Sequence, residues 1–431
     1  MKKFLRKIIF HILKFEAFLV VWKYQPKIIA VTGSVGKTST KDAIYTALSG
    51  FAYVRKSEKS YNSQIGLPLT VLGLPNGWNN LYFWIQNALK GLWLFLYPHN
   101  YPKWLVLEVG VGKPGDMADT ASWLQTDAVV ITAIGETPAH IEFFKNREHL
   151  IEEKAGLIKT LKKDGILVLN ADDEAVLGMK NKTKNIFVTY GFNLDADIVV
   201  SALNISYNEN NQPNGIIFRI DVRGKSLPVS ISGVFGKNHV YASLATFALA
   251  FGLKWNLLEA VNSFKNFEAP PGRMRLLYGI NDTLLIDDTY NASPFACEMG
   301  LKTLGEVKVL GRKIAVLGDM LELGKHTKEA HENIGKIVQE NADILIVVGL
   351  RASFIKDGAI ENGMIPENIF NFLNSFEAGE FLKNFAQKDD LIFLKGSQGM
   401  RMERAVEMIL EDQKNKKDLL VRQDPEWLAK K

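Results

Sequence analysis

Residues 27–38 read KIIAVTGSVGKT, an apolar run rich in β-branched residues that leads into a glycine turn ending in lysine and threonine. This order predicts a buried strand, a phosphate-binding turn and then a helix. Gly33 and Gly36 let backbone N–H groups approach phosphate oxygens. Lys37 adds a positive charge, and the Thr38 hydroxyl can bind the magnesium ion that accompanies a nucleotide. We therefore predict a site for ATP.

The spacing of this turn, GxxGKT, is two residues tighter than the general GxxxxGK[ST] pattern. Taken alone, it also fits an ordinary glycine turn with a surface lysine. The apolar strand before the turn and the helix-forming stretch after it favour the phosphate site.

Composition indicates a folded protein with more than one core. The chain has 431 residues, is 47% hydrophobic and carries a formal net charge of +5, enough apolar material for two or three domains. Its basic excess is spread along the chain, which argues against nucleic-acid binding. The single cysteine, Cys297, excludes an internal disulfide framework and suits a reducing cytoplasm. We expect Cys297 to be buried and apolar in role, not nucleophilic.

The first 22 residues are both basic and apolar. Lysine and arginine interrupt them too often for a membrane span, and no small-residue cleavage site follows. They fit an amphipathic surface helix, with one apolar face made of Phe4, Leu5, Ile8, Ile12, Phe15, Leu19 and Trp22. A face that packs on the protein's own body explains the pattern equally well.

A second segment, residues 78–97, has a similar character. Its apolar residues recur at helical spacing: Trp78, Leu81, Tyr82, Ile85, Leu89, Leu92, Trp93 and Leu96. Aromatic residues at this density suit a membrane interface. A helical hairpin buried against the domain would show the same pattern, so peripheral membrane contact is one of two open alternatives.

The rest of the chain alternates strand-like and helical stretches. The first set indicates a mostly parallel sheet with helices on both faces, with strands at residues 104–109, 128–132, 165–169 and 186–190. Residues 197–232 are typical of an antiparallel annex, and a helix follows at about residues 238–251. The breaker Ala269-Pro270-Pro271-Gly272 predicts a domain boundary. A second α/β rhythm follows, with strands at residues 284–287, 313–317, 344–348 and 391–394.

Three further polar residues are candidates for chemistry. Glu108 ends a predicted strand and precedes a glycine-rich stretch, so its carboxylate would face bound phosphates and act as a magnesium ligand. A structural role for Glu108, as a helix N-cap or as a salt-bridge partner, is the weaker alternative. His140 follows another strand, where a lone histidine is usually structural. Lys154 follows two acidic residues, which is ordinarily the pattern of a solvated helix charge.

Taken together, these residues resemble a known family. The GSVGKT turn, the segment NSQIGLP at residues 62–68, Glu108, His140 and Lys154 are similar to the central domain of the Mur ligases, which join amino acids onto cell-wall precursors. Later blocks resemble the branch that adds D-Ala-D-Ala to a UDP-N-acetylmuramoyl-tripeptide: IDDTYNASP at 286–294, AVLGDMLELG at 315–324 and KGSQGMRME at 395–403. The similarity runs over residues 27–410, with the motifs in the family's order.

The resemblance implies an α/β fold with two main domains. We expect a central P-loop domain with a mostly parallel sheet and an antiparallel annex at residues 27–270, carrying an aromatic insertion at about 76–102. A Rossmann-like C-terminal α/β domain would follow at residues 271–411. A basic amphipathic segment at residues 1–26 and a charged, exposed tail at residues 412–431 would flank them.

The resemblance also implies roles for single residues. Thr38 and Glu108 would bind one Mg²⁺, while His140 and a carbamylated Lys154 would help to bind a second. Lys37, His140 and Lys154 would be catalytic. ATP would contact Gly33, Ser34, Gly36, Lys37, Thr38, Ser39, Asn170, Asn238, Arg273 and Asp288. The pocket for the dipeptide would be shaped by Asn291, Ser293, Lys395 and Ser397.

The implied reaction is amide formation through an acyl phosphate. A carboxylate is a poor electrophile, so it would first take the γ-phosphoryl group of ATP. The amine of D-Ala-D-Ala would then displace phosphate. Domain closure would bring the reactants together and exclude water.

The sequence departs from the family pattern in several places. Members normally begin with a domain that binds the UDP-sugar, and residues 1–26 stand in its place. Ala133 replaces a usual asparagine, the connection at residues 135–138 is slightly long, and Gln398 stands where arginine is common. No predicted metal ligand is lost.

These departures keep several alternatives open. The acceptor is either the UDP-linked peptide or a different, lipid-linked carboxylate, and a phosphotransferase or a non-catalytic scaffold are rival classes. The four metal-ligand positions argue against a scaffold. We expect a cytoplasmic monomer, with contact to the inner face of the membrane as the open alternative.

Overall fold

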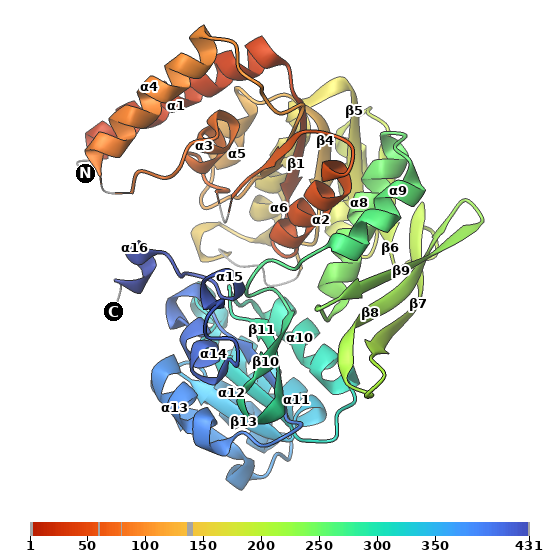
Figure 1. Cartoon of the computed structure of the whole chain (residues 1–431), viewed down its shortest axis with the longest axis vertical. Coiled ribbons are helices and arrows are strands. Elements are labelled where there is room, and N and C mark those ends of the chain that lie inside the picture. The colour runs from red at the N-terminus through yellow and green to blue at the C-terminus, as the bar shows by residue number, and fades with distance from the viewer. Residues whose placement is uncertain (1–2, 59–60, 79, 136–140, 430–431) are drawn as a thin grey trace.

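The computed structural model describes residues 3–58, 61–78, 80–135 and 141–429, with the backbone alone at residues 3–7. Figure 1 shows two α/β bodies, one above the other, with the N-terminal helices at the outer end of the upper body. The predicted fold class, a mostly parallel sheet with an antiparallel annex followed by a second α/β unit, is confirmed. The exact boundaries of the domains stay a prediction.

The upper body contains a nine-stranded sheet within the described residues, in the order β2-β3-β1-β4-β5-β6-β7-β8-β9. The first seven strands in this order pair in parallel, and β7, β8 and β9 form the antiparallel annex. Their bounds are β1 Lys27–Thr32, β2 Val54–Lys56, β3 Trp104–Glu108, β4 Thr126–Ile131, β5 Leu161–Asn170, β6 Phe187–Gly191, β7 Ile198–Tyr207, β8 Pro213–Val222 and β9 Lys225–Ser232.

Alternation along β1 places apolar side chains on both faces of this sheet. Ile29 and Val31 point into one core, while Ile28 and Ala30 point into another. The first core is covered by α2 (Lys37–Ser49), α8 (Lys237–Gly252) and α9 (Leu257–Ser263). The second is covered by α1 (Lys3–Tyr24), α3 (Gly66–Leu72), α5 (Asp116–Ala121) and α6 (Arg147–Ala155). Both faces are therefore buried, as a parallel sheet requires.

The order of the strands decides where the polar residues meet. β3, β1, β4 and β5 are neighbours and run in the same direction, with Val31 opposite Glu108 and Thr32 opposite Ile131. Residues that follow the ends of these strands therefore gather at one edge of the sheet, where open α/β sheets bind ligands.

The lower body is built on a six-stranded sheet within the described residues, in the order β10-β11-β15-β12-β13-β14, in which only the β10–β11 pair is antiparallel. Cys297 is buried in its core, and burial raises the pKa of the thiol to about 12. The strands are β10 Arg275–Gly279, β11 Thr283–Asp288, β12 Lys313–Gly318, β13 Ile344–Val348, β14 Ile369–Phe372 and β15 Leu391–Lys395, and the main helices are α10 Pro294–Glu306, α11 Thr327–Asn341, α12 Ser353–Glu361, α13 Ser375–Phe385 and α14 Glu403–Ile409.

Helices α1 and α4 (Leu81–Leu96) lie side by side at the outer end of the upper body (Figure 1). The α1 helix packs on the body through Leu13, Ala17 and Val20. The face predicted from the sequence points outward instead, with Phe15 61% and Trp22 66% exposed. Within the part of the chain that the structure describes, no helix has the length and hydropathy needed to cross a bilayer.

Glu16 lies between these two helices. A Cβ atom added at Gly91 of α4 would come within 2.1 Å of Glu16 Oε2. This oxygen is buried and has no hydrogen-bond partner among the described residues. Burial raises the pKa of Glu16 to about 7. The α1–α4 contact therefore favours a protonated carboxyl group.

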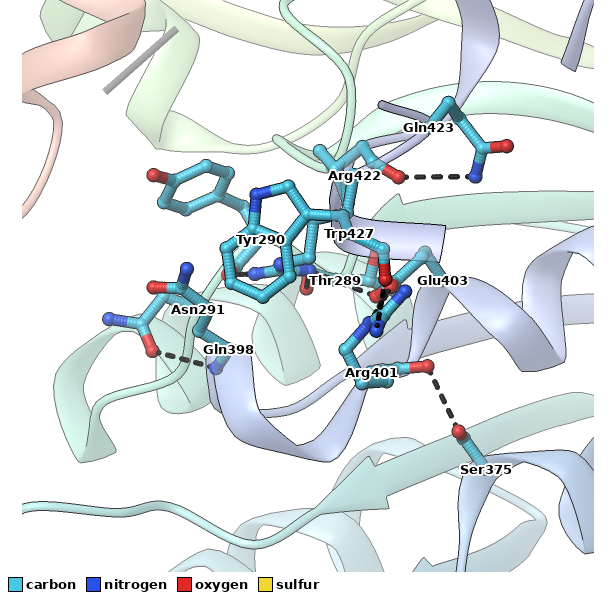
Figure 2. A network of polar contacts seen from close by, with 12 residues as sticks. Thr289, Tyr290, Asn291, Ser375, Gln398, Arg401, Glu403, Arg422, Gln423 and Trp427 are labelled. Atoms are coloured by element: carbon cyan, nitrogen blue, oxygen red, sulfur yellow. Dashed lines mark hydrogen bonds and ion pairs between the residues drawn. The ribbon is translucent and has the colours of Figure 1, made fainter. Parts of the chain in front are cut away.

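The C-terminal segment, expected to be an exposed charged tail, is instead anchored at its centre. Glu403 accepts hydrogen bonds from Arg401 Nε (2.5 Å) and Arg422 Nη1 (2.9 Å), and all three side chains are buried (Figure 2). Arg422 also donates to the carbonyl oxygens of Thr289 and Tyr290. Burial in this segment is confined to Leu420 and Arg422, and most of its other described residues are exposed. The sequence did not indicate the burial of Arg422 because the buried charges find partners only in three dimensions. Two short helices, α15 (Lys416–Leu419) and α16 (Pro425–Leu428), flank Arg422.

We expect Glu16→Gln to stabilise the protein at high pH. The pKa of Glu16 is about 7 in the folded state against 4.5 in the unfolded chain, so the folded state binds the proton more tightly. The free energy of unfolding then falls as pH rises from 4.5 to 7, by at most about 3 kcal/mol. In urea unfolding, the variant should exceed the wild type at pH 8 and approach it at pH 5, while Glu361→Gln, at an exposed helix end, should show no such pattern.

Glu403→Gln should destabilise the protein by about 3–5 kcal/mol, because it leaves two buried guanidinium groups without their carboxylate. Thermal and urea unfolding measure the loss. The matched control is Glu298→Gln, which breaks the exposed i,i+4 pair with Lys302 and should cost less than about 0.5 kcal/mol. Equal losses in the two variants would contradict a structural role for the buried charges.

Candidate active site

The glycine turn is held at the end of β4. Gly33 has φ 144°, and a Cβ at this position would come within 2.0 Å of Thr132 Oγ1. The N–H groups of Ser34 and Val35 donate to Ala133 O. Gly36, with φ 86°, starts α2 without a side-chain cap among the described residues, which leaves the first N–H groups of that helix available to an anion.

Two lysines converge on this turn. Lys37 Nζ lies 3.0 Å and Lys154 Nζ 2.9 Å from the carbonyl oxygen of Gly33. Burial lowers the pKa of Lys37, and Arg273 lowers it further while Glu108 acts in the opposite direction. The pKa of Lys154 falls well below its ordinary value because of burial and the nearby charge of Lys37. Lys154 is therefore a buried residue of the site and not a solvated helix charge.

Glu108, at the end of β3, faces the same place. Its Oε1 accepts a hydrogen bond of 3.0 Å from Asn62 Nδ2, and its Oε2 is buried without a hydrogen-bond partner among the described residues. An unpaired buried carboxylate oxygen fits a cation ligand. The described residues contain no group of three or more histidine, cysteine, aspartate or glutamate side chains that is placed to hold a metal ion. His140, a predicted ligand, lies outside the described residues.

Arg273 connects the two bodies. Its Nη2 donates to Thr38 Oγ1 at 3.3 Å, and its guanidinium lies 4.0 Å from the ring centre of Tyr290. The carbonyl oxygen of Arg273 is held by His239 Nε2 at 2.7 Å, and burial lowers the pKa of this histidine to about 4. A neutral His239 therefore fixes the backbone from which Arg273 reaches the glycine turn.

The residues predicted to hold a dipeptide are mostly engaged within the protein. Lys395 Nζ donates to Asp288 Oδ2 (2.5 Å) and to Asn291 O (2.9 Å). Ser293 Oγ accepts from Ala296 N at the start of α10, and Ser397 Oγ accepts from Leu321 N. Their side chains therefore position the loops around the cleft.

The described residues line three cavities that share walls. A small cavity of about 60 Å³ lies between the glycine turn and the lower body, lined by Ser34, Gly36, Thr38, Ser39, Asn238, Arg273, Asp288, Asn291, Ser293 and Lys395. One of about 480 Å³ is lined by Gly36, Asn170, Asn238, Tyr190 and Tyr241. A cleft of about 800 Å³ is lined by Ser34, Lys37, Glu108, Lys154, Arg273, Asn291 and Ser397. The last two have the size of small-molecule sites.

The structure thus brings together the predicted residues that it describes. It also adds some that the sequence did not single out: Asn62, Tyr190, Tyr241 and Tyr290 line the cavities or contact a predicted residue. Asn62 and Tyr290 lie inside quoted motifs, which was the available signal. Phe10 of α1 also lines the large cleft, and nothing in its spacing indicated that contact.

Comparisons with known proteins agree with this geometry. The Mur ligase middle domain matches residues 31–250, and the Mur ligase, glutamate ligase domain matches residues 272–398. The chain belongs to the Mur ligase family. Membership in this family makes it an ATP-dependent ligase.

Individual relatives agree over most of the chain. UDP-N-acetylmuramoyl-tripeptide–D-alanyl-D-alanine ligase of Bacillus subtilis (strain 168) is 29% identical over 389 residues, 89% of this Mur ligase and 76% of the relative. The ligase of the same name from Buchnera aphidicola is 27% identical over 399 residues, 91% and 79% of the two chains. The crystal structure of MurF ligase from Thermotoga maritima in complex with ADP has a TM-score of 0.76 at 25% identity, covering 93% of this chain and 83% of that one.

Proposed function

We propose that the protein joins D-Ala-D-Ala to the terminal carboxyl group of a UDP-N-acetylmuramoyl-tripeptide, using ATP, in peptidoglycan precursor synthesis. The names of its relatives support this substrate pair. The observation that carries the proposal is the large cleft, in which Lys37, Glu108 and Lys154 share walls with Asn291 and Ser397 of the lower body. One site thus joins a phosphate-binding turn to a second substrate-binding surface.

The chemistry follows from the carboxyl group that must be activated. A carboxylate oxygen attacks the γ-phosphorus of ATP, the bond to the β-phosphate oxygen breaks, and an acyl phosphate and ADP result. The dipeptide amine then attacks the acyl carbon, inorganic phosphate leaves, and the amine loses a proton. Both steps concentrate negative charge on oxygens, so positive groups arranged in advance would lower both barriers.

The chain's own residues provide such groups. The N-terminus of α2 and the Lys37 ammonium would bind the phosphates, and Arg273 would bring the lower body against them. Asn170 and Asn238, in the cavity of about 480 Å³, would lie near the adenine, and Asp288 would set the position of Arg273 and Lys395. The loops that carry Asn291, Ser293, Lys395 and Ser397 would shape the dipeptide pocket.

We also propose two magnesium sites. The residues present fit the first: Glu108 offers a buried oxygen with no hydrogen-bond partner in the described part of the chain, and Thr38 offers a hydroxyl group. His140 and a carbamylated Lys154 would hold the second. Bound magnesium would neutralise charge on the transferred phosphoryl group. The proposed setting is a monomer in the cytoplasm that does not bind nucleic acid.

Carbamylation suits the surroundings of Lys154. Its neutral amine would attack carbon dioxide, form an N–C bond and release one proton, which converts the neutral amine into an anionic carbamate. The carbamate would attract the charge of Lys37, and it would place an anionic oxygen donor where burial and Lys37 disfavour a cation.

Release of ADP should require both the tripeptide and D-Ala-D-Ala. We expect Glu108→Gln to slow ADP release about 10²–10³-fold by removing charge at the phosphates, whereas the exposed Glu298→Gln should leave it unchanged. The measurement is a coupled ADP assay with each substrate omitted in turn. ADP release at the full rate without the dipeptide would instead identify a phosphotransferase.

Lys154 should yield a carbamate signal after incubation with ¹³C-bicarbonate, detected by ¹³C NMR and by trapping before mass spectrometry. Lys154→Ala should lose that signal and slow turnover by about 10²-fold. Lys159→Ala, on the exposed part of the same region, should retain both. A wild-type spectrum identical to that of Lys154→Ala would refute carbamylation without bearing on the substrates.

A further inference from the structure

An apolar surface covers the outer side of helices α1 and α4. We define it, as the α1–α4 face, by Ile12, Phe15 and Trp22 of α1 and Leu89, Trp93 and Leu96 of α4. Their exposed fractions run from 40% at Ile12 to 66% at Trp22. The residues recur at helical spacing, and the two helices lie side by side (Figure 1), so the exposed side chains form two parallel stripes.

This arrangement differs from the ordinary exposure of apolar residues. Leu194, Leu310 and Leu350 are more exposed than any of the six, and each lies in a loop, where a single apolar residue needs no explanation. Six large side chains on two adjacent helices form the kind of surface that marks an interaction site.

The two helices are basic in sequence. Lys14 is paired with Asp119, and Lys23 donates to the carbonyl oxygens of Phe95 and Tyr97, so among the described side chains of these helices Lys90 is the exposed basic one. The sequence of α1 contains Lys3, Arg6, Lys7, Lys14 and Lys23 against a single acid, and α4 contains Lys90 and no acid. The one acidic residue, Glu16, does not offset them at the surface because it is buried against Gly91 between the helices. Aromatic side chains at the headgroup level and basic residues beside them are the usual features of helices that lie on anionic membranes.

We propose that the α1–α4 face docks on the surface of an anionic lipid bilayer. The two helices would lie in the interface plane, with Trp22 and Trp93 among the acyl-headgroup boundary and the basic residues near lipid phosphates. A second copy of the chain is a poorer occupant, because a self-paired face would bring the same positive charges together.

Docking would also set the orientation of the site. Phe10, on the same helix as the outward stripe, lines the large cleft that contains Lys37 and Glu108. The bilayer would therefore lie close to the wall of the cleft. The structural basis of docking is separate from the chemistry, since none of the six defining residues lines a cavity of the site.

The test is flotation of the full-length protein with vesicles of phosphatidylcholine alone or mixed with phosphatidylglycerol. The wild type should float with the anionic vesicles, and less so as salt is raised. The triple variant Phe15→Ser, Trp22→Ser, Trp93→Ser should reduce the floating fraction at least about tenfold, because each substitution removes apolar burial in the interface. The control triple Leu194→Ser, Leu310→Ser, Leu350→Ser should float like the wild type.

A second variant, Lys90→Glu, tests the charge separately and should weaken flotation with anionic vesicles only. Circular dichroism and ADP release without vesicles should be the same for all variants, which separates this proposal from the proposed reaction. Absence of wild-type flotation, or equal flotation of both triple variants, would overturn the proposal. So would a dimer in sedimentation velocity that the first triple variant abolishes while no form floats.

Discussion

Two lysine side chains share one backbone carbonyl, and the rest of the site is organised around them. Lys37 and Lys154 both donate to Gly33 O, Arg273 adds a guanidinium cation, and Glu108 is the carboxylate whose charge offsets that of Lys37. Burial of unneutralised charge is unfavourable, which is why the pKa of each lysine is lowered. Phosphates, and in the proposed function a carbamate, would supply the negative charge that the protein does not.

The arrangement depends on both bodies of the molecule. Adjacent parallel strands place the glycine turn and Glu108 at one edge of the nine-stranded sheet. Arg273, which follows the predicted domain boundary in the sequence, contacts Thr38 at the same edge. Arg273 donates to the same Thr38 hydroxyl that is proposed to bind magnesium. A metal ion and a guanidinium repel each other, so nucleotide binding would move Arg273 from Thr38 toward the phosphates. The contact between the bodies is thus tied to the state of the site.

Much of this could be predicted from the sequence, because local patterns carry it. Long apolar runs predicted the central strands, and GSVGKT predicted the glycine turn. The structure adds the steric reason for Gly33, because a Cβ at this position would clash with Thr132 Oγ1. The short strands β2, β10 and β14 gave too little periodicity. The burial of Arg422 within the tail was not predicted because Arg422 is charged, and its burial depends on Glu403, which pairs with it only after folding. For the same reason the sequence pattern around Lys154 did not indicate a chemical role. The family resemblance alone indicated one.

The orientation of α1 was the other feature that the sequence left open, and the outcome is informative. The helix carries two apolar stripes, and it buries the one with smaller side chains, Ala17 and Val20, while Phe15 and Trp22 face outward. If water were the only surroundings of the outer face, burying the larger aromatic residues would release more free energy. Small residues do allow α1 to pack closely against α3 and α4. In the same way, the absence of a side chain at Gly91 leaves room for the carboxyl group of Glu16. A bilayer interface, the proposed partner of this face, would give the aromatic stripe an apolar environment.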